Sequence, residues 1–134
     1  MLKRILVEIY MAAAFVLLYN RGFTGERRHE MLGLTVFILV LFHLALNYRW
    51  FRRMGRSSRT VTNLFTIVTF FGTILTGIAS SELFESVNRL DSALISDFRE
   101  LHACFAYAAL CAVALHAFQH GKSIYQRFLY ILKT

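Results

Sequence analysis

Four long apolar segments constrain the fold of this chain more than any other feature. They cover residues 5–20, 29–50, 61–79 and 98–120 of a 134-residue sequence in which 57% of the residues are apolar and 17% are charged. A soluble domain is on average less apolar and more charged, whereas a helix of about 20 mostly apolar residues can cross the hydrocarbon core of a bilayer. The sequence has no proline to break such helices. We therefore expect one all-α domain over residues 1–134, a transmembrane four-helix bundle that runs up, down, up and down in the lipid bilayer.

The charges between the segments predict the orientation of this bundle. Ten basic residues would share the side that holds both termini, against five on the other side, namely Arg21, Arg27, Arg28, Arg89 and Arg99. The positive-inside rule then places both termini in the cytoplasm. The net charge of +7 is explained by the membrane, and no aromatic platform or groove-reading motif points to nucleic acid. The first segment follows Lys3 and Arg4 as a secretory signal would, but no small-residue cleavage site follows it, so we expect a span.

The connection between the third and fourth segments, residues 80–97, is the longest. Leu83, Val87, Leu90 and Leu94 recur there at helical spacing, which predicts a short amphipathic helix on the outer surface. An unstructured polar loop is the alternative. In the third segment, Asn63 and several threonines, together with Gly72 and Gly77, predict a helix packed closely inside the bundle, because small and hydroxyl residues let membrane helices approach.

The five histidines fall only on the second and fourth segments. His29 and His43 are 14 residues apart, and so are His102 and His116. Fourteen residues are two heptads, so both histidines of a helix point in the same direction, about 21 Å apart along its axis. The second and fourth helices of such a bundle run parallel, which predicts His29 beside His102 at the outer depth and His43 beside His116 at the inner depth. Each pair can supply both axial ligands of a haem iron, from side chains on facing helices.

Other interpretations of the histidines predict different chemistry. A single histidine in a membrane span usually makes an interhelical hydrogen bond, but intramembrane ionisable groups are costly, and four at matched depth indicate a function. A zinc or copper site generally needs three or four converging nitrogens, whereas the two pairs stand about 21 Å apart. Covalent c-type attachment would need a CxxCH sequence, which the chain lacks. Two b haems are therefore the expected cofactors, and no catalytic residue is assigned.

Further residues are expected around the cofactors. Small side chains would make room for the macrocycle, namely Gly33, Ala106 and Ala112. Propionates need cations or donors near each surface, and the candidates are Arg27 or Arg28 outside and Asn47, Arg49, His120 or Lys122 inside. His120, one turn beyond His116, could contact a propionate or a quinone, or could be a plain interfacial histidine.

Two runs of sequence resemble a known family. The similarity is carried by HEMLGLTVFILVLFHLALNYRW in the second segment and LHACFAYAALCAVALHAFQH in the fourth. Both are similar to the flavinylation-associated membrane cytochromes, the DUF4405 domain family, in the HE-x(2)-G start, the second histidine and the exit NYRWFRR. The paired 14-residue spacing of the histidines also resembles that of the two-haem bundle in respiratory cytochrome b. The resemblance implies b haems, a bacterial or archaeal cytoplasmic membrane, and electron transfer between the quinone pool or a partner enzyme and an extracytoplasmic flavin, iron–sulfur or haem protein.

A haem iron with two imidazole ligands has no open site for oxygen or substrate, so it exchanges only electrons. We expect a chain that carries electrons across the membrane as a subunit of a respiratory oxidoreductase complex rather than as a stand-alone enzyme. One alternative is a haem-free membrane anchor or assembly subunit. Another is a small quinol-oxidising enzyme, in which Glu8, Glu30 or His120 could accept protons.

Overall fold

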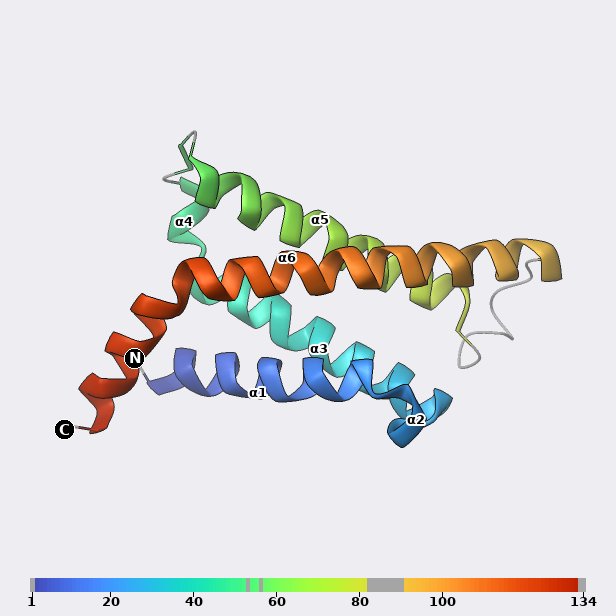
Figure 1. Cartoon of the computed structure of the whole chain (residues 1–134), viewed down its shortest axis with the longest axis horizontal. Helices are drawn as coiled ribbons and strands as arrows, with labels where there is room; N and C mark the ends of the chain where they lie inside the picture. The colour runs from blue at the N-terminus through green and yellow to red at the C-terminus, as the bar shows by residue number, and fades with distance from the viewer. Residues whose placement is uncertain (1, 53, 56, 82–90, 133–134) are drawn as a thin grey trace. The chain divides into compact units, whose positions relative to one another are not determined.

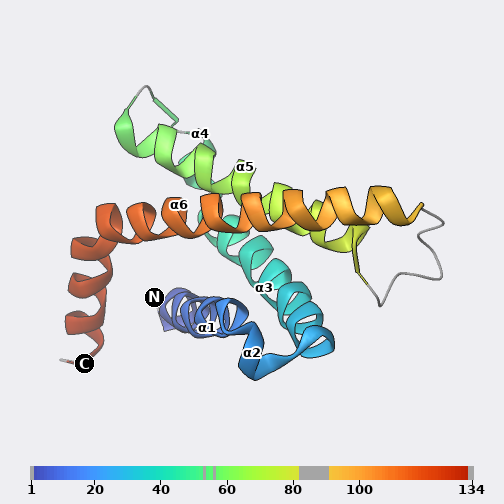
Figure 2. The same ribbon diagram turned by 45° about the vertical axis from the view of Figure 1, so that its right-hand side comes forward.

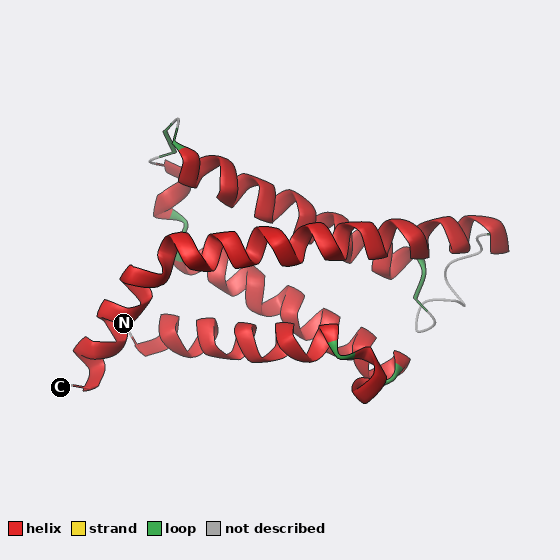
Figure 3. Cartoon of the chain, in the orientation of Figure 1, coloured by secondary structure: helices red, strands yellow, loops and turns green. Residues whose placement is uncertain are grey.

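The computed structural model describes residues 2–52, 54–55, 57–81 and 91–132, and within these ranges the regular structure is entirely helical (Figures 1 and 3). The helices are α1 (Leu2–Tyr19), α2 (Arg21–Thr24), α3 (Glu26–Leu46), α4 (Arg49–Arg52), α5 (Ser58–Ala79) and α6 (Ser92–Leu132). The expected all-α class is confirmed. The chain divides into two compact units, one comprising Met1–Gly55 with Ala117–Thr134 and the other comprising Arg56–His116.

In the first unit α1 and α3 lie side by side, joined through the short helix α2 (Figures 1 and 2). Gly25 separates α2 from α3 with a φ of 71°, a conformation that glycine adopts without steric cost. An ion pair of 2.7 Å between Arg21 and Glu26 spans this turn. At the other end of the pair, the Arg4 guanidinium donates to the Leu46 carbonyl over 2.8 Å, which satisfies one of the carbonyls that a helix end leaves without an intrahelical donor.

Helix α3 ends at Leu46, earlier than the predicted boundary at residue 50. The next residue, Asn47, has left the helical conformation, and its side-chain Nδ2 donates to the His43 carbonyl over 2.8 Å. Asparagine competes in this way for main-chain hydrogen bonds and therefore favours helix ends. The remaining residues of the predicted span form the separate turn α4.

In the second unit, α5 begins one turn before the predicted span and ends with it at Ala79. Ser57 caps the helix, because its hydroxyl accepts the Thr60 N–H over 3.2 Å. The hydroxyls along α5 donate to carbonyls of the preceding turn, and those bonds are made by Thr62, Thr66, Thr69, Thr73 and Thr76. Each hydroxyl is therefore satisfied within the helix, as burial in an apolar environment requires.

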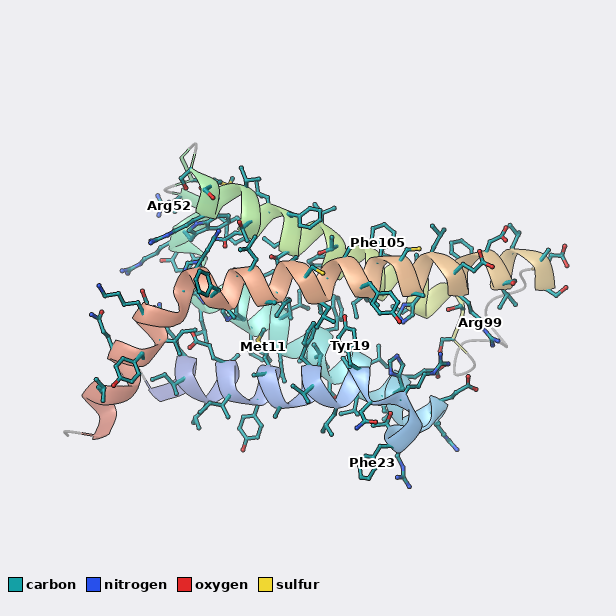
Figure 4. The ribbon with its side chains drawn as sticks, viewed as in Figure 1. Met11, Tyr19, Phe23, Arg52, Arg99 and Phe105 are labelled. Carbon is teal, nitrogen blue, oxygen red and sulfur yellow. The ribbon has the colours of Figure 1, made fainter. Side chains whose placement is uncertain are left out.

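Helix α5 packs closely against the first part of α6. A Cβ built on Gly72 would lie 2.6 Å from ring atoms of Phe105, the α6 side chain labelled in Figure 4. The Thr66 hydroxyl also reaches the Ala112 carbonyl over 3.3 Å, and Ala112 is only 2% exposed. The expected close packing at Gly72 is confirmed. Ala112 was predicted to make room for a cofactor, but its small side chain instead lets α5 approach.

Helix α6 is longer than the predicted span, since it begins at Ser92 rather than residue 98 and ends at Leu132 rather than residue 120. Hydropathy marks only the apolar part of a helix, and this sequence places no proline at either side to stop it. Leu94, expected in an outer amphipathic helix, belongs to the first turn of α6. The other residues of that predicted helix, Leu83, Val87 and Leu90, lie outside the described residues.

Three helices among the described residues are long and apolar enough to cross a membrane, namely α3, α5 and the Ser92–Gln126 part of α6. Large apolar side chains stand exposed on them, with Phe118 at 84% and Tyr107 at 68%, which is compatible with contact with lipid. Helix α1, predicted as a fourth span, is not among the three. Because Lys3, Arg4 and Glu8 occupy its first turns, only about 16 Å of it is free of charged residues, against about 30 Å of hydrocarbon.

Candidate cofactor-binding site

His102 is held by the main chain of α5. Its Nδ1 lies 2.9 Å from the Thr73 carbonyl oxygen. A carbonyl oxygen can only accept, so Nδ1 carries the proton of the neutral ring. The ring lone pair is then on Nε2, and histidines that donate from Nδ1 to a carbonyl typically ligate metals through Nε2.

Gly77 gives His102 access to that carbonyl. A Cβ built on Gly77 would lie 3.0 Å from both Cε1 and Nδ1 of His102. In a helix the side chain four residues on stands beside a given carbonyl, so a larger residue at position 77 would crowd the imidazole that bonds to Thr73. The glycine therefore serves the position of the histidine as well as the approach of the two helices.

His116 is held by a side chain of α5. Its Nδ1 lies 2.9 Å from Oδ1 of Asn63, and Asn63 is 8% exposed. The amide oxygen accepts, so His116 has the same tautomer as His102, with its proton on Nδ1 and its lone pair on Nε2. Both histidines of α6 therefore face α5, which confirms for this helix that a 14-residue spacing puts them on one side.

His29 is held by the end of α1 in the first unit. Its Nδ1 lies 3.1 Å from the Leu18 carbonyl oxygen, which belongs to the last turn of α1, where carbonyls have no donor within their own helix. His29 thus satisfies a helix terminus and takes the same tautomer as the two histidines of α6. Helix α1 has this role whether or not it crosses the membrane.

His43 lies half-buried on α3. Its main-chain carbonyl accepts both the side-chain Nδ2 and the main-chain N–H of Asn47, over 2.8 and 3.1 Å. Asn47 was predicted to meet a propionate or a quinone. The structure places its Nδ2 instead in the hydrogen bond that ends α3, where it donates to the main-chain carbonyl of His43.

The remaining predicted residues lie around these histidines along their helices. Arg27 and Arg28 are exposed and line a groove of the first unit with apolar side chains that include Leu17 and Met31. A Cβ built on Gly33 would meet no heavy atom within 4 Å, so the chain leaves open space beside it, one turn after His29. Ala106 and His120 are half-buried on α6, Arg49 is exposed at the start of α4, and Lys122 is exposed.

The four predicted ligands are divided between the two units. His29 and His43 belong to the first unit, and His102 and His116 to the second. The three Nδ1 hydrogen bonds described above each lie within one unit. Among the described residues, no three His, Cys, Asp or Glu side chains converge as a protein-only metal site would require.

Sequence reasoning missed the partners that hold the rings. Asn63 carried a signal, since it is the only amide side chain in the third apolar segment, but it was interpreted only as a packing residue. The carbonyls of Thr73 and Leu18 carry no signal, because every residue has a carbonyl and only the packing selects which one a histidine meets. Comparison of the chain with protein-family models, with curated proteins and with solved structures finds no match.

Proposed function

We propose that this chain is a di-haem b-type membrane cytochrome that carries electrons across the membrane. The observation that carries the proposal is the shared tautomer of three histidines, His29, His102 and His116, each of which donates from Nδ1 to an oxygen. Histidines that ligate metals almost always donate their other ring nitrogen in this way, which orients the ring and raises its basicity. A histidine placed in a span only to join two helices would have no need of the same tautomer at every position.

The proposed ligand pairs are His29 with His102 and His43 with His116. Consecutive spans cross a membrane in opposite directions, so α3 and α6, separated by the single span α5, run parallel. This argument needs only the three helices α3, α5 and α6, and it holds without a spanning α1. With equal spacings of 14 residues on parallel helices, a common depth of His29 and His102 also gives His43 and His116 a common depth.

The residues of the chain fit this cofactor. The open space beside Gly33 suits a flat macrocycle next to His29. Arg27 and Arg28 on one side, and Arg49, His120 and Lys122 on the other, supply the cations and donors that propionates need near each surface. When bound, a haem with two histidine ligands supplies one-electron oxidation and reduction at iron without an open coordination site. The protein sets the potential through burial and through the hydrogen bonds to the ligands.

The proposed setting is a bacterial or archaeal cytoplasmic membrane, with this chain as a subunit of a larger redox complex. The support is the resemblance of the segments around His29 and His102 to the flavinylation-associated membrane cytochromes. The partners would be the quinone pool or an enzyme at one surface and an extracytoplasmic flavin, iron–sulfur or haem protein at the other. The excess of basic residues beside the ends of the spans places both termini in the cytoplasm if α1 completes a four-span bundle.

The test is a reduced-minus-oxidised optical spectrum of the purified chain, produced with haem supplied. We expect the bands of low-spin b haem, unchanged when carbon monoxide is added to the reduced protein, because both axial positions are filled. A chain that takes up no haem under these conditions is a haem-free anchor. A carbon monoxide adduct would mean that an axial position is open and that the paired-histidine assignment is wrong.

Gly33→Phe is expected to lower the haem content from two per chain to one. The open space around position 33 admits the phenylalanine ring in the haem-free chain. The variant should therefore fill the space proposed for the cofactor without disturbing the fold. Haem per chain and helix content by circular dichroism are measured together. Gly22→Phe is the control, because position 22 is equally open but lies in α2, outside the helix that carries His29. Full retention of two haems in Gly33→Phe would place the outer haem elsewhere.

His120→Ala is expected to keep both haems and to shift the potential of the inner one. His120 lies about 6 Å beyond His116 along α6, close enough for a propionate but beyond the proposed ligand. A redox titration of the variant measures the shift. If the inner haem disappears in His120→Ala and persists in His116→Ala, His120 is the ligand.

A further inference from the structure

The face of α6 that carries both histidines is continuous. It consists of His102, Phe105, Ala109, Ala112 and His116, spaced alternately by three and four residues, which is the pattern of a seam between two packed helices. The seam meets α5 along its whole length, through the contacts of Gly77, Gly72, Thr66 and Asn63. Both histidines therefore sit at the ends of one packed interface, with Ala109 and Ala112 buried between them at 2% exposed.

We propose that α5 is a clamp that fixes His102 and His116 in the Nδ1–H tautomer before any cofactor binds, and that Asn63 is the positioning residue of the inner ligand. The tautomer is a property of the chain alone, whereas its effect on a cofactor rests on the proposed function. Which ring nitrogen carries the proton is set by the hydrogen bond that the other one makes. In this unit the acceptors come from a neighbouring helix whose register is set by packing.

The other polar side chains of α5 do not compete with this arrangement. The hydroxyls of Thr62 and Thr66 donate to carbonyls of their own helix, over 3.1 and 2.8 Å. Asn63 is the one amide between them, and its oxygen meets His116. A buried amide is costly unless it is hydrogen-bonded, and the bond to His116 satisfies the Asn63 oxygen at this depth.

The two acceptors differ in a way that mutation can exploit. His102 bonds to a main-chain carbonyl, which no substitution at Thr73 removes, and the Thr73 side chain itself donates to Thr69. His116 bonds to a side chain, which Asn63→Leu removes at similar volume. The inner ligand is therefore the one whose basicity depends on a single replaceable group. Loss of that acceptor weakens the imidazole as a donor to iron, and we expect the potential of the inner haem to rise.

The first experiment measures the tautomers in the haem-free full-length chain by ¹⁵N NMR of labelled histidine, with each signal assigned by its alanine variant. We expect His102 and His116 in the Nδ1–H form. Asn63→Leu should move His116 toward the Nε2–H form that neutral histidine favours in water, and leave His102 unchanged. Thr73→Val should move neither, because the carbonyl remains. Thr69→Val, which removes a buried hydroxyl that meets no histidine, controls for general loosening of α5.

Three results of this experiment would overturn the clamp, two of them at His116 itself. One is His116 in the Nε2–H form in the unsubstituted chain, and the other is an unchanged Nδ1–H form in Asn63→Leu. A shift in Thr69→Val as large as that in Asn63→Leu would also do so, because general loosening would then explain the effect. Since none of these measurements uses haem, the clamp can fail while the cytochrome proposal stands, and a chain that binds no haem can still have the clamp.

The second experiment uses the haem-loaded chain. Asn63→Leu should raise one of the two midpoint potentials and leave the other in place, while Thr73→Val should change neither. A merely structural role for Asn63 would shift both potentials together or lower the haem content without a shift, and either outcome would contradict a specific link from Asn63 to the inner ligand.

Discussion

Replacing His102 with alanine is expected to remove one of the two haems, and replacing His29 is expected to remove the same one. In either variant the same iron would lose one axial ligand, and the remaining imidazole alone would hold the cofactor poorly. His43→Ala and His116→Ala should both remove the other haem. Haem per chain should fall from two to one in all four variants.

A redox titration identifies which haem remains. Variants of one pair should retain the same midpoint potential, and variants of the other pair should retain the second. His120→Ala is the control for loss of an imidazole from α6, and it should keep two haems. If His29→Ala and His116→Ala lose the same haem, α3 and α6 do not run parallel and the proposed pairs are wrong.

Gly72→Leu is expected to release haem although it removes no ligand. A single added Cβ would already come within 2.6 Å of the Phe105 ring, and overpacking of this kind typically costs about 1–3 kcal/mol. Leucine would force α5 away from α6 and so would separate the acceptors at Thr73 and Asn63 from their histidines. We expect most of the haem to be lost and the thermal unfolding temperature to fall.

A compensating change tests this explanation. Phe105→Ala removes the ring that Gly72→Leu would strike, so the double variant should regain haem relative to Gly72→Leu, a coupling expected only of residues in contact. Ala103→Leu, which also ends in a leucine side chain but at an exposed position of α6, should keep two haems. Normal haem retention in Gly72→Leu would mean that the separation of α5 and α6 does not control the site.

Much of the fold follows from apolar runs, because the length and composition of a segment suffice to predict a helix that can span a membrane. Both ends of α5 lie within one turn of the ends predicted for the third segment. Gly72 correctly indicates that this helix packs closely against another. The ends of the other helices depend on individual interactions that hydropathy does not contain. Asn47 ends α3 early through its bond to His43, and α6 continues past its apolar part. The fourth span expected of the first segment is not confirmed, since Lys3, Arg4 and Glu8 leave only about 16 Å of α1 free of charged residues.

In the candidate site, the positions of the histidines could be predicted from the sequence, whereas the hydrogen-bond partners of their rings could not. The spacing of the histidines is a one-dimensional pattern, and it correctly puts His102 and His116 on one face of α6. The atoms that orient the rings come from residues distant in sequence, such as Thr73 with its main-chain carbonyl, and become visible only when helices are packed. Ala112 illustrates the limit, because a small residue on a helix can make room for a cofactor or for another helix, and the sequence is the same in both cases.

The central claim, that four histidines of this chain bind two b haems, is tested most directly by the ratio of haem to protein. The chain would be purified from cells supplied with haem, its haem measured as the pyridine complex, and its protein measured by amino-acid analysis. The account predicts two non-covalently bound haems per chain in the unsubstituted protein and none when His29, His43, His102 and His116 are replaced together. A ratio of zero in the unsubstituted protein, or one that is unchanged by the fourfold replacement, would contradict it.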